Sequence, residues 1–281
     1  MPTIDVGGRT RTYTVATSGA DKRLLLVFHG SKQDGAAFRR FTGNAFDELP
    51  GTAVVYLDSY RKNWNDARAA SAFPARRENV DDVAFAEAVA GRLADGRPVY
   101  AAGFSNGGGM VIRLLHERPG LLAGAAVIAA QQPAPGNFLL PGLPVVPKPV
   151  LLFHGTKDRI VRYDGGSMAA WARFAFKTGG AMLSAPATAA YFAARNGITA
   201  PPVTVDLPGS VGRAGSVGRA GSGKTSMSRT DYREDGRAPV TLYTVHGGGH
   251  TIPGRKPSPA VMGRTGNAVY ATDSIVDFFG F

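Results

Sequence analysis

One stretch in the first half of the chain restricts the possible folds more than any other. Residues 99–102 form a short apolar run typical of a buried strand, and helical spacing of apolar residues resumes from Met110 to His116. Between them lies Gly103-Phe104-Ser105-Asn106-Gly107. A strand that turns directly into a helix needs small residues on both sides of the turn. The stretch therefore predicts a strand, turn and helix that lift the Ser105 hydroxyl clear of the backbone.

The rest of the chain alternates strand-like and helix-like segments. The apolar runs at 24–28, 53–57 and 150–153 are typical of strands buried on both faces, while 83–93 has apolar residues at helical spacing. This alternation predicts an α/β protein with a mostly parallel central sheet and helices on both faces. The other expected elements are a helix at 36–49, strands at 203–207, 227–232 and 240–245, and an N-terminal β-hairpin of 4–6 and 11–15 around Gly7-Gly8.

Length and low-complexity sequence define the domain organisation that we expect. The chain has 281 residues, 44% of them apolar, and these suffice for one domain over residues 1–281. Residues 210–221 contain Ser-Val-Gly-Arg-Ala-Gly twice, so we predict that 209–225 is a flexible Gly/Ser/Arg insertion. Residues 218–225 match G-x-x-x-x-G-K-T, but they follow a glycine repeat instead of a buried strand. We therefore expect no nucleotide site there.

Charge and hydropathy bear on partners and compartment. The formal net charge is +11, but the densest basic groups are pairs such as Arg39-Arg40 and Arg76-Arg77, so we expect no nucleic-acid partner. No apolar run is long enough for a membrane span, and the first residues do not resemble a signal peptide. The sequence as written fits the cytoplasm, or a periplasmic or secreted protein whose leader is removed; it leaves compartment and oligomeric state open.

A serine nucleophile requires an acid and a histidine, which follow it in that order in folds of this type. The strand at 150–153 leads into His154-Gly155-Thr156-Lys157-Asp158, which places Asp158 just beyond a strand end. Asp158 is therefore the predicted orienting acid. Asp164 is an alternative, although it also fits the N-cap of a following helix.

The histidine is expected on the loop after the strand at 240–245, which reads His246-Gly247-Gly248-Gly249-His250. A glycine run is useful where a loop must bring a side chain close to other backbone, so His250 is the predicted general base. His246, at the strand end, is predicted to be structural. Its H-G-G-G string resembles an esterase oxyanion hole, but such a motif belongs well before the serine.

An oxyanion hole needs two backbone N–H groups, which we assign to Asn106, after the nucleophile, and to Ser31, in the loop after the early strand. The remaining histidines do not have the spacing of metal ligands. We therefore expect no metal and no cofactor. The absence of cysteine excludes disulfides and thiolate metal sites.

Five segments of the chain form a recognisable set of motifs. They are Leu26-Val27-Phe28-His29-Gly30, Val80-Asp81-Asp82-Val83-Ala84-Phe85, Gly103-Phe104-Ser105-Asn106-Gly107-Gly108, His154-Gly155-Thr156-Lys157-Asp158 and Gly247-Gly248-Gly249-His250-Thr251-Ile252-Pro253-Gly254. Together they resemble the polyhydroxybutyrate depolymerase, feruloyl esterase and acetyl xylan esterase group of α/β-hydrolases. This resemblance implies an α/β-hydrolase fold with Ser105, Asp158 and His250 as its triad. Members of the group often carry a cysteine where this chain has Ser31 and a tryptophan where it has Ile252.

Substrate contacts are expected from loops, because the fold does not determine which ester binds. The segment 58–79 carries Tyr60, Trp64 and Phe73, which either flank a substrate or cap the core. We take Trp64, Tyr60 and Ile252 as substrate-binding candidates. The segment 131–149 is a possible hydrophobic lip or a surface crossing.

The sequence thus predicts a serine carboxylic ester hydrolase that works through an acyl-enzyme on a small or polymeric ester of the polyhydroxyalkanoate, feruloyl or acetyl type. A peptidase or acyltransferase with the same triad is the alternative within enzymes. A non-catalytic binding protein on a hydrolase scaffold is the alternative outside them.

Overall fold

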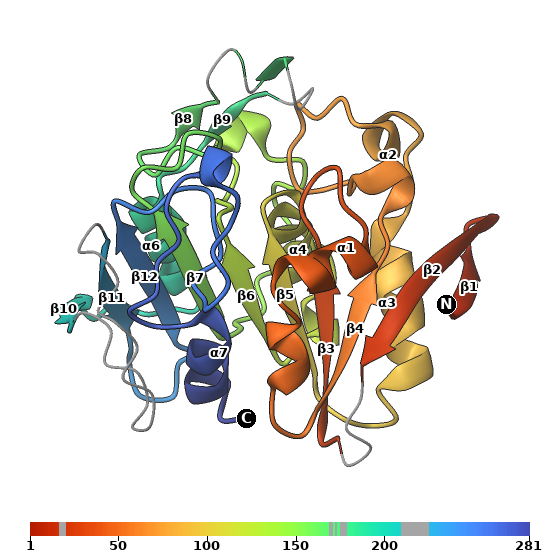
Figure 1. Ribbon diagram of the computed structural model, residues 1–281, viewed down its shortest axis with the longest axis horizontal. Helices are drawn as coiled ribbons and strands as arrows, with labels where there is room; N and C mark the ends of the chain where they lie inside the picture. Colours follow the sequence, from red (N-terminus) through yellow and green to blue (C-terminus); the bar gives the residue numbers. More distant parts are fainter. Residues whose placement is uncertain (17–20, 169–170, 172, 175–178, 209–224) are drawn as a thin grey trace.

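The apolar runs form the strands of a central sheet in the computed structural model, which describes residues 1–16, 21–168, 171, 173–174, 179–208 and 225–281 (Figure 1). Within these residues ten strands are joined in the order β1-β2-β4-β3-β5-β6-β7-β12-β11-β10. They are β1 Thr3–Val6, β2 Arg9–Ala16, β3 Arg23–Phe28, β4 Thr52–Leu57, β5 Val99–Phe104, β6 Gly124–Ile128, β7 Val150–Gly155, β10 Val203–Leu207, β11 Ser226–Tyr232 and β12 Val240–His246.

The six strands from β4 to β12 in this order are parallel, and antiparallel strands lie at both edges. The hairpin β1–β2 pairs with β4 at one edge, and β11 and β10 follow β12 at the other. The predicted mostly parallel sheet and its N-terminal hairpin are therefore confirmed. The predicted insertion falls between the paired strands β10 and β11, and residues 209–224 of it lie outside the described part of the chain.

Helices cover both faces of the sheet, and the side chains of its buried strands alternate between two cores. In β3, Leu24, Leu26 and Phe28 enter the core beneath α3, α4 and α6, whereas Leu25 and Val27 face α1 and α7 (Figure 1). The helices are α1 Gly35–Phe41, α2 Pro74–Arg77, α3 Asp82–Leu93, α4 Asn106–Glu117, α6 Ala185–Arg195 and α7 Ala271–Phe279, and β8 Gly166–Ser167 pairs with β9 Ala181–Met182 as a separate ribbon.

The predicted single helix at 36–49 is wrong in its extent. The helix α1 ends at Phe41, and a short 3₁₀ helix, Ala45–Glu48, follows it. Gly43 and Asn44 between them have φ angles of 67° and 61°. These left-handed conformations end a helix, and glycine and asparagine adopt them most readily. No helix in the described residues combines the length and apolar character that crossing a membrane requires.

His116, near the end of α4, is a core residue. Its Nδ1–H donates to the Ile112 carbonyl at 2.8 Å, and its Nε2 accepts from the Tyr191 hydroxyl of α6 at 2.9 Å. Burial lowers its pKa from the ordinary 6.5 to about 4, and the pKa of buried His29 falls by the same cause to about 4. Both rings are therefore neutral at neutral pH.

These two histidines predict a stability that falls with acidification. Between pH 6.5 and about 4 the unfolded chain binds protons that the folded chain excludes, so the free energy of unfolding should decrease as pH falls through this window. Urea unfolding at a series of pH values measures the slope. His116→Gln should make this slope shallower because one of the groups with a lowered pKa is removed. Identical slopes in the two proteins would contradict the prediction.

Candidate active site

Ser105 occupies a sharp turn between β5 and α4. Its φ of 54° and ψ of −119° are strained for a residue other than glycine, and this strain persists only because the surroundings hold the turn. The Ser105 amide donates to the Ile128 carbonyl of β6 at 2.9 Å. A Cβ on Gly107 would lie 2.1 Å from the Phe28 carbonyl oxygen, and one on Gly103 would lie 2.3 Å from the Gly107 carbonyl oxygen. The glycines are therefore required by close backbone contact.

The structure brings the three predicted triad residues together although they are distant in sequence. His250 Nε2 lies 2.9 Å from Ser105 Oγ, and His250 Nδ1 lies 2.7 Å from Asp158 Oδ2. Because a carboxylate accepts from Nδ1–H, Nε2 is left as the acceptor of the serine hydroxyl proton. The alternative acid, Asp164, is exposed, and no hydrogen bond or ion pair among the described residues joins it to His250.

Asp158 is held as an ionised acceptor. Burial alone would raise the pKa of this carboxyl, but the charge and hydrogen bond of His250 outweigh it, with further lowering by His154 and the Val161 amide. Asp158 Oδ1 accepts the amides of Ile160 and Val161, each at 2.8 Å. His154 donates from Nε2 to the Val161 carbonyl at 2.8 Å, and burial lowers its pKa. The carboxylate is thus fixed in position beside His250.

The glycine run before His250 allows the backbone contacts that the sequence predicted. A Cβ on Gly249 would lie 2.1 Å from the Met262 carbonyl oxygen, and one on Gly155 would lie 2.4 Å from that of Gly249. The His250 amide donates to Met262 at 2.8 Å. His246 instead lies at the end of β12, where its ring contacts the Ser228 hydroxyl at 2.9 Å, in keeping with its predicted structural role.

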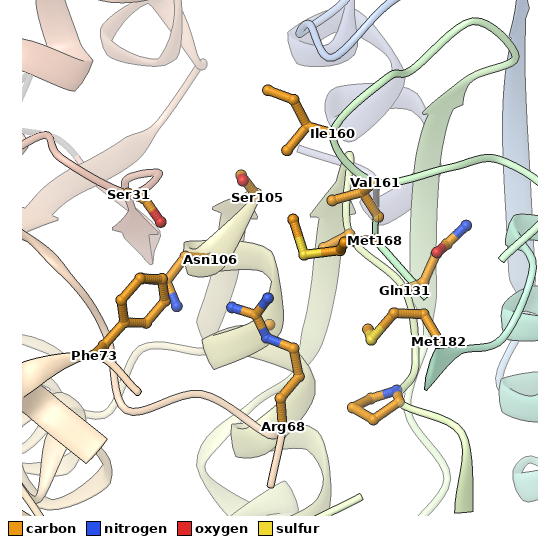
Figure 2. A pocket seen from close by; sticks show the side chains of 13 residues that line it. Ser31, Arg68, Phe73, Ser105, Asn106, Gln131, Ile160, Val161, Met168 and Met182 are labelled. Carbon is orange, nitrogen blue, oxygen red and sulfur yellow. The ribbon is translucent and has the colours of Figure 1, made fainter. Parts of the chain in front are cut away.

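Ser31 and Asn106, the predicted oxyanion-hole residues, line the same pocket as Ser105 (Figure 2). Asn106 is the first residue of α4, so its backbone N–H has no acceptor within the helix. Its side chain is buried: Oδ1 accepts the Trp64 amide at 2.7 Å, and Nδ2 donates to Asp66 Oδ2 at 2.6 Å. These bonds connect the turn to the loop that follows β4.

The pocket beside Ser105 has a volume of about 40 Å³. Its wall is mainly apolar, with Phe73 and the two methionines opposite each other and the guanidinium of Arg68 between them (Figure 2). The lining residues are Ser31, Arg68, Phe73, Ser105, Asn106, Gly109, Ala130, Gln131, Pro133, Ile160, Val161, Met168 and Met182. Residues from 58–79 and 131–149 thus contribute to it.

None of the three residues chosen as substrate contacts lines this pocket. Trp64 has no exposed surface, because its indole N–H donates to the His29 carbonyl at 2.9 Å and its ring packs edge-on against Phe28. Tyr60 donates from its hydroxyl to Glu78 at 2.8 Å. Ile252 lines a separate cavity near α1 and α7. These three substrate-binding candidates therefore lie outside the pocket beside Ser105.

Sequence analysis missed Arg68, which is buried and paired with Asp66 at the floor of the pocket. Asp66 has no exposed surface. An available signal was the spacing Asp66-x-Arg68 in a loop between a buried strand and a buried helix, where charges need partners. Nothing in the spacing indicates that the guanidinium turns toward Ser105.

The fold and the position of this pocket define an α/β-hydrolase. No family model matches the chain. An esterase by name, NocK of Nocardia uniformis subsp. tsuyamanensis, is 34% identical over 97% of this chain and 80% of its own length. The acetyl xylan esterase of Aspergillus awamori is similar in structure, with a TM-score of 0.56, 14% identity and coverage of 95% of this chain and 93% of its own.

The relation to NocK shows that the chain belongs to the same family of α/β-hydrolase esterases. The acetyl xylan esterase supports the fold alone.

The backbone contact at Gly107 generates a prediction. Gly107→Ala should prevent the chain from folding normally or lower its stability by about 3 kcal/mol or more, because the methyl group would overlap the Phe28 carbonyl. Gly91→Ala in α3 is the matched control, since a Cβ there meets no atom within 4 Å. Alanine favours the helix at that site, so thermal unfolding should show equal or greater stability. Equal melting of the two variants would refute the packing argument.

Proposed function

We propose that this esterase is a serine carboxylic ester hydrolase that works through an acyl-enzyme. The observation that carries the proposal is the hydrogen-bonded series from Ser105 Oγ to His250 and from His250 to buried Asp158. This arrangement fits nucleophilic catalysis, in which a base removes the serine proton and an acid orients that base.

Each residue has a distinct role in the proposed reaction. His250 Nε2 accepts the hydroxyl proton as Ser105 Oγ attacks the ester carbonyl carbon, and Asp158 stabilises the resulting imidazolium. The backbone N–H groups of Ser31 and Asn106 donate to the oxyanion. His250 then gives its proton to the leaving alkoxide, which departs as an alcohol. Water, activated by the same histidine, hydrolyses the acyl-enzyme and restores Ser105.

The pocket supports a short acyl group among the ester types that the sequence suggests. A volume of about 40 Å³ with an apolar wall fits an acetyl or short aliphatic acyl group better than a feruloyl group. We therefore place acetyl and short polyhydroxyalkanoate-type esters ahead of feruloyl esters. No step of the proposed reaction needs a metal or cofactor.

The first test compares the wild-type protein with Ser105→Ala on nitrophenyl acetate and butyrate, methyl ferulate, acetylated xylan and polyhydroxybutyrate. We expect the wild type to hydrolyse the short esters fastest, with an initial burst of nitrophenol that reports the acyl-enzyme. Ser105→Ala should lose at least about 10³-fold in kcat. Equal hydrolysis by both proteins would refute the mechanism.

The same assay separates the proposed hydrolase from its alternatives. A peptidase would cleave the matching nitroanilides at comparable rates, and an acyltransferase would transfer the acyl group to an added alcohol in preference to water. A binding protein would retain ester without turnover. Esters cleaved to acid and alcohol support the proposal.

Asp158→Asn tests the role of the acid separately. The amide preserves the shape of the side chain but cannot stabilise the imidazolium, so kcat should fall by about 10⁴-fold. Asp164→Asn is the matched control, because this side chain is exposed and no hydrogen bond or ion pair among the described residues joins it to His250. A larger loss from Asp164→Asn than from Asp158→Asn would reverse the assignment.

A further inference from the structure

We propose that the pocket beside Ser105 accepts an acyl chain that ends in a carboxylate, and that Arg68 selects it. This inference rests on the proposed function and names its substrate class: monoesters of short dicarboxylic acids. Hydrolysis would consume one water and release the alcohol and a free dicarboxylate.

Arg68 is placed where an acyl chain would reach it. It lines the pocket together with Ser105, and Figure 2 shows its guanidinium pointing into the space bounded by Phe73, Asn106 and Met168. Its side chain is only 11% exposed. Asp66 already pairs with this cation, and in such a buried setting the attraction of the guanidinium for a further anion is stronger than in water.

The guanidinium also retains donors for a ligand. Nε donates to Asp66 Oδ2 at 3.0 Å, and Nη2 donates to the same oxygen. No hydrogen bond or ion pair given for the described residues uses Nη1 of Arg68. Both N–H groups of Nη1 therefore have no hydrogen-bond partner among the described residues, and a carboxylate is the acceptor that matches a guanidinium best in charge and geometry.

The charged groups around Arg68 carry more positive than negative charge. Arg68 shares the Asp66 carboxylate with a second cation, Arg76. The Nη2 of Arg76 donates to the backbone carbonyls of Asp66 and Arg68, and the Arg76 guanidinium is also attracted to the Asp66 carboxylate. The neighbouring charges are already matched: Arg113 with Glu117 at 2.8 Å and Arg11 with Asp82 at 2.7 Å. Two guanidinium groups therefore face one carboxylate, and a substrate carboxylate would balance them.

A wide groove next to the pocket independently favours an anionic substrate. It shares Ile160 with the pocket and is lined by four exposed basic residues, Lys157, Arg159, Arg162 and Arg264. No ion pair among the described residues involves these four, and Asp164 is the one exposed acid in the lining. A concave surface of one charge attracts oppositely charged substrates. These four basic residues form no continuous cluster in the sequence, but the fold brings them together beside His250.

The deciding substrates differ only in charge. Monomethyl glutarate is compared with the methyl ester of the half-amide of glutaric acid, and the succinate and adipate pairs cover shorter and longer chains. We expect the wild type to favour the carboxylate member of one pair in kcat/KM by about ten-fold or more. Arg68→Gln should lower this ratio by about ten-fold to a hundred-fold, and Arg68→Lys, which keeps the charge, should lower it less.

Direct binding covers the case in which Arg68 variants fold poorly, because Asp66 is buried. Calorimetric titration of the wild type with glutarate, succinate or adipate should show binding at least about ten-fold tighter than with the matching half-amide, weakening as salt is added. Equal affinity for acid and half-amide, or an unchanged kcat/KM ratio in folded Arg68→Gln, would overturn the inference. Wild-type hydrolysis of neither ester, with selective glutarate binding retained, would instead reject the proposed function alone.

Discussion

The site depends on the close packing of the Gly107 backbone against the end of β3. Because no side chain separates them, the first turn of α4 lies beside the loop that carries Ser31, and the two predicted oxyanion donors face one pocket. The neighbouring strands β6, β7 and β12 are parallel, so their carboxyl ends reach the same edge of the sheet. Asp158 and His250 follow two of these ends. One backbone contact and one strand order therefore bring Ser105, Asp158 and His250 together.

The loop between β4 and α3 supports this turn through buried polar contacts. Trp64 anchors it to the His29 carbonyl, and Asn106 joins it to Asp66 through a hydrogen bond of 2.6 Å. Asp82 accepts the Asn65 amide at 2.7 Å. Buried charges of this kind are costly unless every partner is present, so removing one weakens the others. The loop holds the turn at Ser105 in place and also carries Arg68 into the pocket.

The parts of the fold that the sequence predicted correctly depend on local patterns. The strands were recognisable as apolar runs. Ser105, Asp158 and His250 were each expected within a few residues of a strand end, and the structure brings their side chains into contact. The helix break at Gly43-Asn44 was missed because apolar spacing continues across it. The sequence also could not show whether the Trp64 side chain is buried or exposed to substrate, because an indole in a loop packs equally well on a substrate or in a core. Its direction depends on the His29 carbonyl, which is remote in sequence.

Arg68 affects selectivity through what it excludes as well as through what it binds. A neutral acyl chain in the pocket would cover Nη1 of the guanidinium and would offer it no acceptor. A carboxylate there would accept charge-assisted hydrogen bonds from it. Selectivity therefore combines an attraction for the ester that ends in a carboxylate with a desolvation cost for the neutral ester. In this way a small pocket distinguishes ligands of equal size.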